Sequence, residues 1–266
     1  PEGMRKVVLA TNIAETSLTI EGIRLVVDCA QERVARFEPR TGLTRLITQR
    51  VSQSSMTQRA GRAGRLEPGI CLHLIAKEQA ERASAQSEPE ILQSDLSGLL
   101  MELLQWGCSD PTQMSWLDQP PAVNLQAAKR LLRMLGAMDG ERLSTKGQKM
   151  ATLGNDPRLA AMLVSARSDD EAATAAKITA ILEEPPRMGN IDLGVAFSRN
   201  QPAWQQRSQQ LLKRLNVCGG EADSSLIAPL LAGAFADRIA RRRGQEGRYQ
   251  LANGMGAMLD ADDALS

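Results

Sequence analysis

Residues 6–22 read KVVLATNIAETSLTIEG, and this stretch decides the fold class. Its first five residues form a short apolar run, which is typical of a buried strand in a parallel sheet. Residues 23–28 (IRLVVD) have the same character. Two such strands joined by a polar connection predict an α/β domain. Because two strands are too few for its sheet, we expect further strands upstream.

The overall composition is that of a globular protein. The chain has 266 residues, of which 42% are hydrophobic and 24% are charged. Its few aromatic residues (3%) predict cores of Leu, Ala, Val, Ile and Met, which suit helix packing. Four cysteines lie far apart without a CxxC pair, so a zinc site or a disulfide framework is not expected. We expect no membrane span, no signal peptide and a cytoplasmic location.

The basic residues are concentrated at the N-terminal end. The net charge is only +1, but residues 1–76 hold 11 Lys and Arg against 7 Asp and Glu. Ten of those 11 cations are Arg, whose planar guanidinium group suits phosphate. Residues 77–155 are slightly acidic, with 8 cations against 10 anions.

Further β structure is expected downstream. Residues 33–48 predict a β-hairpin around a turn at Pro39, Arg40, Thr41 and Gly42. Residues 69–75 (GICLHLI) predict another strand. His73 within it is interpreted as a core or sheet-face residue, in preference to a ligand or base.

From residue 90 the hydrophobic period becomes helical. A helix is expected from a cap near Ser94 and Asp95 to Gly107, and another from residue 124 to 135. Residues 139–144 predict a tight turn into a short strand, and a third helix is expected at 145–153. This order predicts a winged-helix domain at 90–155.

The remaining residues predict a helical bundle. Helices are expected at 159–166, 169–182, 201–217 and 226–242, with an ordered loop at 185–200. Residues 156–245 would form this bundle. A strand at 248–251 suggests that residues 246–266 are a tail or the start of a truncated β domain.

Two segments are the candidates for chemistry, and the first is residues 11–22. Hydroxyl, amide and carboxylate groups follow a strand there, at the edge where open α/β sheets bind ligands. An ordinary capped turn explains the same residues equally well.

The second segment, residues 58–65, reads QRAGRAGR. On a helix, Arg62 and Arg65 would share one face, and the glycines between them would leave it open to a triphosphate. Two guanidinium groups so placed can stabilise a transferring phosphoryl group. A solvated basic helix end is the alternative, but glycines inside a helix cost about 1 kcal/mol each, which favours a function.

Together the two segments resemble motifs V and VI of the DEAH/RHA branch of superfamily 2 helicases, and most closely those of bacterial HrpB-type members. The hairpin, the lead-in SQSSMTQR and the downstream segment DPRLA extend the resemblance to about residue 245. It implies a fold that is α/β and then mainly α. Residues 1–80 would be the C-terminal part of the second RecA-like lobe, followed by the winged helix and the ratchet-like bundle.

The resemblance also implies roles for particular residues. Arg62 and Arg65 would contact the γ-phosphate of ATP, and Gln58 would position phosphate or the attacking water. Thr19 and Glu21 match positions near the ribose and the Mg²⁺-bound phosphates, although Asp is commoner at the latter. Nucleic-acid contacts would come from Thr11, Asn12, Arg33, Arg36 and Arg40. For the three hairpin arginines, a solvated face is nearly as good an explanation.

The 266 residues contain no GxxxxGK[ST] phosphate loop and no strand-borne DEAH box. ATP and Mg²⁺ would therefore be held mainly by an upstream RecA-like domain of the same protein. We expect no metal site in this chain and no ATPase activity from the chain alone. The whole protein would hydrolyse ATP to move along or remodel single-stranded RNA, with DNA possible.

Two other classes remain. A winged-helix module could bind nucleic acid or a protein without an ATP cycle, although residues 77–155 lack the basic surface that DNA readout needs. A helical scaffold with an incidental Arg-rich end is disfavoured, because both motifs occur in the right order. A phosphate loop and a DEAH box upstream in the open reading frame would decide for the helicase.

Overall fold

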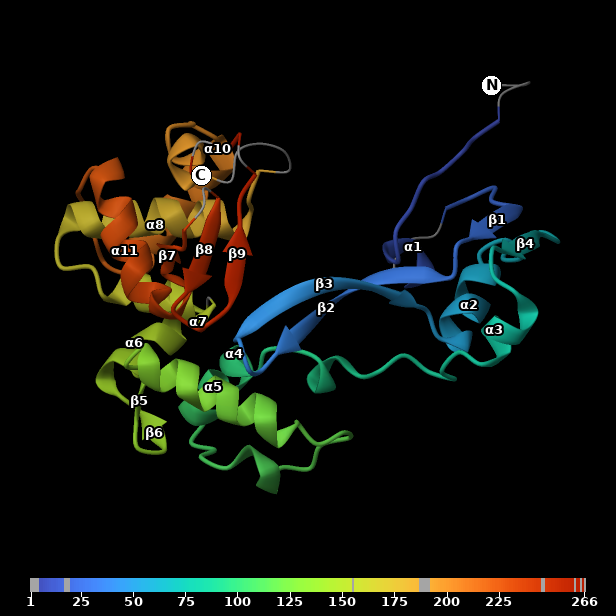
Figure 1. Cartoon of the computed structure of the whole chain (residues 1–266), viewed down its shortest axis with the longest axis horizontal. Helices are drawn as coiled ribbons and strands as arrows, with labels where there is room; N and C mark the ends of the chain where they lie inside the picture. Colours follow the sequence, from blue (N-terminus) through green and yellow to red (C-terminus); the bar gives the residue numbers. More distant parts are fainter. Residues whose placement is uncertain are drawn as a thin grey trace. The chain divides into compact units, whose positions relative to one another are not determined.

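The computed structural model describes residues 5–16, 20–154, 156–186, 192–244, 247–260, 262, 263 and 265. The described residues form two compact units. The first combines Pro1–Glu38 with Leu43–Ser94, and the second combines Pro39–Gly42 with Asp95–Ser266. The structure is mixed α/β, as the sequence predicts (Figure 1).

The first unit contains a parallel strand pair, a hairpin and short helices. Its elements are α1 (Ile13–Thr16), β1 (Leu25–Asp28), β2 (Gln31–Glu38), β3 (Leu43–Arg50), α2 (Gln53–Ala60), β4 (Ile70–His73), α3 (Lys77–Glu81) and η1 (Glu90–Leu92). Strands β1 and β4 are parallel, with Asp28 opposite His73 at their carboxyl ends. This register brings the Asp28 and His73 side chains together at the ends of the two strands, where Asp28 also contacts Arg59 of the candidate site.

The expected strand at residues 6–10 is wrong, since no strand is assigned among the described residues before β1. Val7 is 84% exposed and Leu9 is 96% exposed. A strand in a parallel sheet requires neighbours that pair with its backbone and cover its side chains. No described residues do so here, so the apolar run remains extended without a ladder. The strands expected at 23–28 and 69–75 are confirmed as β1 and β4.

The hairpin prediction is confirmed. Strands β2 and β3 are antiparallel, with Gln31 opposite Arg50 and Glu38 opposite Leu43. The turn closes through Gly42, whose φ of 68° favours glycine. The turn residues belong to the second unit, where three side chains donate to their carbonyl oxygens. These are Arg130 to Pro39 (3.1 Å), Asn253 to Thr41 (3.0 Å) and Arg238 to Gly42 (3.3 Å).

The hydrophobic core beneath the first unit's helices is small. Ala30, Val51 and Met56 are buried, and Ile75, Ala80 and Ala83 pack against them. The Ala30 amide donates to Asp28 Oδ1 (3.0 Å), and the Val51 amide donates to the Ala30 carbonyl (3.1 Å). These bonds fix the chain between β1 and β2, so the Asp28 carboxylate is held where the strand ends.

The first part of the second unit follows the helical pattern of the sequence. It comprises α4 (Ser97–Gln105), η2 (Pro111–Gln113), α5 (Ala122–Met134), β5 (Met138–Asp139), β6 (Arg142–Leu143) and α6 (Thr145–Leu153). Helix α6 begins where the Ser144 hydroxyl accepts the Gly147 amide (3.0 Å), and it ends at Gly154. The three expected helices and the turn between the last two are confirmed.

The later helices depart from expectation in two places. The elements are α7 (Pro157–Val164), α8 (Asp169–Glu183), α9 (Leu193–Phe197), α10 (Pro202–Arg214), η3 (Ser224–Leu226), α11 (Ile227–Ala234) and η4 (Ala236–Arg238). The loop expected at 185–200 contains α9, and its residues 187–191 lie outside the described residues. The helix expected at 226–242 is shorter in the structure. It ends at Ala234, whose carbonyl oxygen accepts a hydrogen bond from Arg158 Nη1 at 3.0 Å.

The end of the chain forms a small antiparallel sheet in the order β7 (Ala240–Arg242), β8 (Arg248–Leu251) and β9 (Gly256–Met258). Strand β7 uses residues that the sequence assigned to a helix, because it pairs with β8, with Ala240 opposite Leu251. The strand expected at 248–251 is confirmed. Among the described residues, no helix has the length and apolar character needed to cross a membrane.

Candidate functional site

Helix α2 carries the second candidate segment, and its start is firmly fixed. The Ser52 hydroxyl accepts the Ser55 amide (3.2 Å) and is bonded to the hydroxyls of Ser54 and Ser87. The Gln53 side chain donates to the carbonyl oxygens of Glu81 (2.9 Å) and Ala83 (2.8 Å). An N-cap and a link to the α3 region together hold the helix in place.

The end of α2 corrects one sequence inference. The helix ends at Ala60 with Gly61 as its cap, so Arg62 and Arg65 lie beyond it and do not share a helix face. The chain continues in tight turns, in which the Arg62 amide donates to the Arg59 carbonyl (3.1 Å). Arg62 is partly buried and Arg65 is exposed. The glycines therefore do not interrupt a helix, and the helix cost used above does not apply.

Arg59, on the last turn of α2, joins three parts of the chain. Its Nε donates to Glu15 Oε2 (3.0 Å), and its Nη1 donates to Asp28 Oδ1 (2.9 Å). The same Nη1 lies 3.1 Å from the Gln31 carbonyl oxygen. The side chain is only 13% exposed. Burial by itself lowers the pKa of Arg59, but the hydrogen bonds and charges of Asp28 and Glu15 outweigh it, and the pKa is raised.

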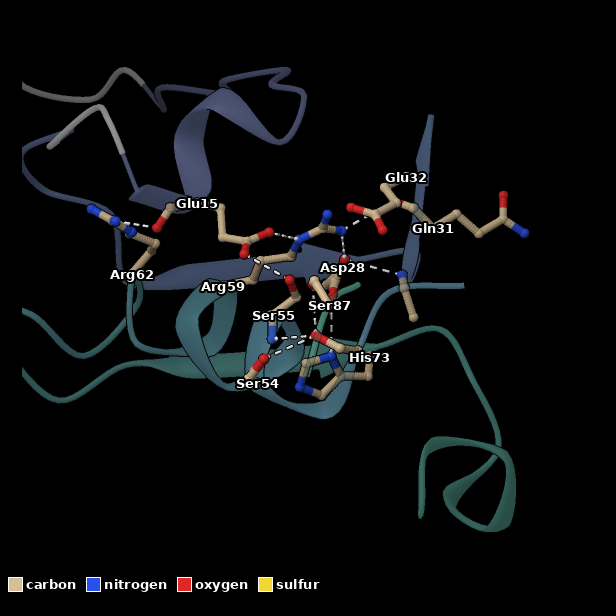
Figure 2. Close-up of polar contacts among 12 residues, drawn as sticks. Glu15, Asp28, Gln31, Glu32, Ser54, Ser55, Arg59, Arg62, His73 and Ser87 are labelled. Atoms are coloured by element: carbon tan, nitrogen blue, oxygen red, sulfur yellow. Dashed lines mark hydrogen bonds and ion pairs between the residues drawn. The ribbon is translucent and has the colours of Figure 1, made fainter. Parts of the chain in front are cut away.

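Glu15, on α1, receives contacts from three residues of the α2 segment (Figure 2). The Ser55 hydroxyl donates to Oε1 (2.7 Å), and Arg59 donates to Oε2. Arg62 donates through Nη2 to the main-chain carbonyl oxygen of Glu15. The guanidinium groups of Arg59 and Arg62 lie on either side of Glu15 in this view. The first candidate segment is thus held against the second.

Asp28 completes the network on the strand side. Its Oδ2 lies 3.1 Å from His73 Nδ1, and Cys71 Sγ lies 3.6 Å from the other ring nitrogen. Burial, with the charge of Asp28, raises the pKa of the Cys71 thiol. A thiol with a raised pKa is a poor nucleophile at neutral pH. His73, at the end of β4, thus contacts Asp28 with one ring nitrogen and Cys71 with the other.

The remaining predicted residues occupy different surroundings. Gln58 is exposed on α2, and Glu21 is exposed in the turn before β1. Thr11 and Asn12 are exposed before α1, where their carbonyls accept the Ala14 (3.1 Å) and Glu15 (2.9 Å) amides. Thr19 lies outside the described residues. Asn12 and Arg62 thus both contact the main chain of Glu15.

The hairpin arginines form a separate group. Arg33, Arg36 and Arg40 are all exposed. Arg36 pairs with Glu88 at 3.0 Å, and both side chains are about half exposed. A pair this open contributes little to stability, so Arg36 could exchange Glu88 for another anion at low cost.

Sequence reasoning missed Glu15, Asp28, Ser55 and Arg59 as parts of the site. Glu15 and Arg59 lie inside the two segments that were singled out, and Asp28 ends a predicted strand. Opposite charges inside such segments are a usable signal, because charges that become buried need partners. The sequence alone does not tell which carboxylate meets which arginine.

Comparisons with known proteins agree with the resemblance. Residues 1–67 match the family described as "Helicase conserved C-terminal domain". The ATP-dependent RNA helicase HrpB of Escherichia coli is 92% identical over 266 residues, which are 100% of this chain and 33% of that protein. The E. coli helicase HrpA is 32% identical over 220 residues, covering 80% of this chain and 17% of HrpA.

A solved structure gives the same result. The crystal structure of the E. coli DEAH/RHA helicase HrpB matches with a TM-score of 0.97 at 92% identity, over 100% of this chain and 34% of that one. The chain therefore spans about a third of the length of HrpB and of the chain in that crystal structure.

Proposed function

The chain belongs to the DEAH/RHA branch of the superfamily 2 helicases, and on that premise we propose that it is part of an ATP-dependent RNA helicase. In this proposal residues 1–80 belong to the second RecA-like lobe. The whole protein hydrolyses ATP to move along, or to remodel, single-stranded RNA.

One observation carries the proposal: the segment before and within α1 is held against the end of α2 through Glu15. The two segments that resemble motifs V and VI are 44 residues apart at Glu15 and Arg59, yet they form one polar site. A site that combines exposed hydroxyl and amide groups with guanidinium groups suits a ligand rich in phosphate.

The residues of this site fit nucleotide phosphate better than a metal ion. Arg62 and Arg65 offer planar guanidinium groups, which pair with phosphate oxygens in a bidentate manner. Among the residues that the structure describes, no group of three or more His, Cys, Asp or Glu could hold a metal. In the proposed enzyme, ATP supplies the phosphoryl group, and Mg²⁺ neutralises part of its charge in the upstream lobe.

The chain's own residues then have the following proposed roles. Arg62 and Arg65 stabilise the charge that develops on the γ-phosphoryl oxygens, and Gln58 orients the attacking water. Thr19 and Glu21 lie near the ribose and the phosphates. Thr11 and Asn12 hold the RNA backbone, with Arg33, Arg36 and Arg40 available for further phosphates. Such contacts read no bases, so binding is sequence-tolerant and weakens with salt.

We further propose the finer domain assignment. Helices α4, α5 and α6 with the β5–β6 turn support a winged helix at 90–155. Helices α7, α8, α10 and α11 support a ratchet-like bundle within 156–245, since α8 packs against α10 and α7 against α11. Residues 246–266 add β8 and β9 to β7. These parts would close over the single strand in the cytoplasm.

The decisive test is ATP turnover by the longer protein that carries this chain together with a nucleotide-binding lobe. Arg62→Ala and Arg65→Ala are each expected to lower RNA-stimulated kcat about 1,000-fold or more, which is the scale of an arginine finger. Arg82→Ala, an exposed arginine at the end of α3, is the matched control and is expected to leave kcat unchanged. Undiminished turnover in Arg62→Ala would refute the assignment.

A further inference from the structure

We propose that Glu15 and Arg59 are positioning residues for Arg62, and that the main-chain carbonyl of Glu15 is the resting partner from which a nucleotide phosphate takes the Arg62 guanidinium group. This inference rests on the proposed function, because it presumes that Arg62 acts on phosphate. It assigns roles to two residues that touch neither the nucleotide nor the RNA.

The Glu15 side chain is fixed at both oxygens. Ser55 occupies Oε1 at 2.7 Å and Arg59 occupies Oε2 at 3.0 Å. The Glu15 side chain is 14% exposed, so water competes little for these bonds. With its carboxylate held twice, Glu15 is tethered to α2.

Arg62 contacts the main chain of the same residue, Glu15. Its Nη2 donates to the Glu15 carbonyl oxygen, next to the side chain that Arg59 holds (Figure 2). The carbonyl is a neutral acceptor, whereas a phosphate oxygen is charged. A phosphate adds the attraction of opposite charges and can accept two parallel hydrogen bonds from one guanidinium group. The carbonyl can therefore orient Arg62 in advance and still lose it to phosphate.

Arg59 is not itself available to an anion. Its guanidinium group already meets two carboxylates, Glu15 and Asp28, and a carbonyl oxygen. Asp28 in turn is bonded through its second oxygen to His73. An incoming phosphate would have to displace paired charges at a site of low exposure, which is costly. The two arginines on either side of Glu15 thus have different tasks.

The consequence for catalysis is preorganisation. A guanidinium group that is already oriented loses less conformational entropy when the transition state forms. If Glu15 moves, Arg62 keeps its charge but loses its direction. We expect variants at Glu15 and Arg59 to slow the chemical step more than they weaken ATP binding, because ATP is held mainly by the upstream lobe.

The experiment uses the longer helicase and measures RNA-stimulated kcat and the KM for ATP. Glu15→Gln and Arg59→Gln are each expected to lower kcat roughly 10- to 100-fold with a KM changed less than about threefold, as for a misplaced catalytic group. Arg59→Lys should recover part of the loss, because an ammonium group can pair with one carboxylate. The control is Arg50→Gln. Arg50 lies at the end of β3, where its side chain contacts Gln79, and the kcat of this variant should stay within twofold of the wild-type value.

A double variant separates positioning from general weakening of the fold. In the Arg62→Ala background, Arg59→Gln should change single-turnover hydrolysis less than twofold, because the group that it positions is gone. In the Arg65→Ala background its effect should persist. RNA binding without nucleotide and the thermal midpoint of unfolding show whether each variant is folded. If Arg59→Gln does not fold, the nearly isosteric Glu15→Gln still tests the inference.

Two results would overturn the inference. The first is an unchanged kcat in folded Glu15→Gln and Arg59→Gln variants, while Arg62→Ala is inactive. The second is an Arg59→Gln loss of equal size with and without Arg62. Failure of the proposed function is distinguishable from both, since it would leave Arg62→Ala itself active.

Discussion

Each of the two units contains an arginine of low exposure that is paired with carboxylate, and the two are built differently. Arg158 at the start of α7 is 6% exposed and binds both oxygens of Asp237, at 2.6 and 2.7 Å. It also donates to the Ala234 carbonyl and lies 5.4 Å from the centre of the Phe235 ring. Arg59 divides its donors between Glu15 and Asp28.

The difference indicates what each arginine is for. A bidentate pair with one carboxylate fixes two elements, here α7 and η4, in one geometry. It lies among well-buried helices. Arg59 joins three separate segments beside a small core, and one of them carries the partner of Arg62. We infer that Arg158 stabilises the fold, whereas the proposed task of Arg59 is to arrange a site.

The largest expected effect is on the second unit. Arg158→Met leaves Asp237 without its partner, and breaking a buried pair in this way costs about 3–5 kcal/mol. The three tryptophans, Trp106, Trp116 and Trp204, all lie in this unit, so the urea midpoint of Trp fluorescence measures the loss. Arg158→Met combined with Asp237→Leu should recover much of it, since no unpaired charge remains. A midpoint unchanged in Arg158→Met would contradict the comparison.

A smaller effect is expected from Arg59→Gln on stability. Hydrogen bonds to charged groups contribute about 1.5–3 kcal/mol, and those of Arg59 are partly replaced by the amide. Because the first unit has no Trp, its loss should appear as faster amide hydrogen exchange in residues 25–60 with the fluorescence midpoint unchanged. A shift of the fluorescence midpoint as large as that of Arg158→Met would show that the two pairs do not act separately.

The sequence predicted much of the fold because most elements are specified locally. Helix α6 has a Ser cap, a periodic apolar face and a terminal Gly154 with φ of 64°, and its predicted bounds are those observed. The strand at 6–10 failed because a parallel strand depends on neighbours that the local sequence does not contain. The helix at 226–242 is shorter than predicted because residues 240–242 pair with β8, while Arg158, far away in the chain, donates to the Ala234 carbonyl oxygen at the observed helix end.

The site followed the same rule. The segments 11–22 and 58–65 were found from residue types and spacing, and the structure brings parts of both together. The shared helix face of Arg62 and Arg65 was wrong, because propensity alone did not locate the end of α2. The pairing of Arg59 with Glu15 and Asp28 spans 44 and 31 residues. Such partners follow from the tertiary arrangement, so no local pattern predicts them.

The smallest expected effect is on pH dependence, and it concerns Asp237. Burial alone would raise the pKa of this carboxyl group, but hydrogen bonds from Arg158 and the charges of Arg158 and Arg238 outweigh it, and the pKa is lowered. The resulting stability is present above the unfolded pKa of about 3.9 and is lost as the pH falls through the lower native pKa. One such group changes the free energy of unfolding by at most about 1.4 kcal/mol per pH unit.

The gap in stability between the wild-type chain and Arg158→Met should therefore be largest near neutral pH and narrow as the pH falls toward and below about 4, because without Arg158 the burial of Asp237 favours its protonated form. Fluorescence-detected urea unfolding at several pH values measures it in the second unit alone. A gap that stays constant down to low pH would mean that Arg158 stabilises this unit mainly through its packing on Phe235, because a ring contact does not depend on whether Asp237 is ionised.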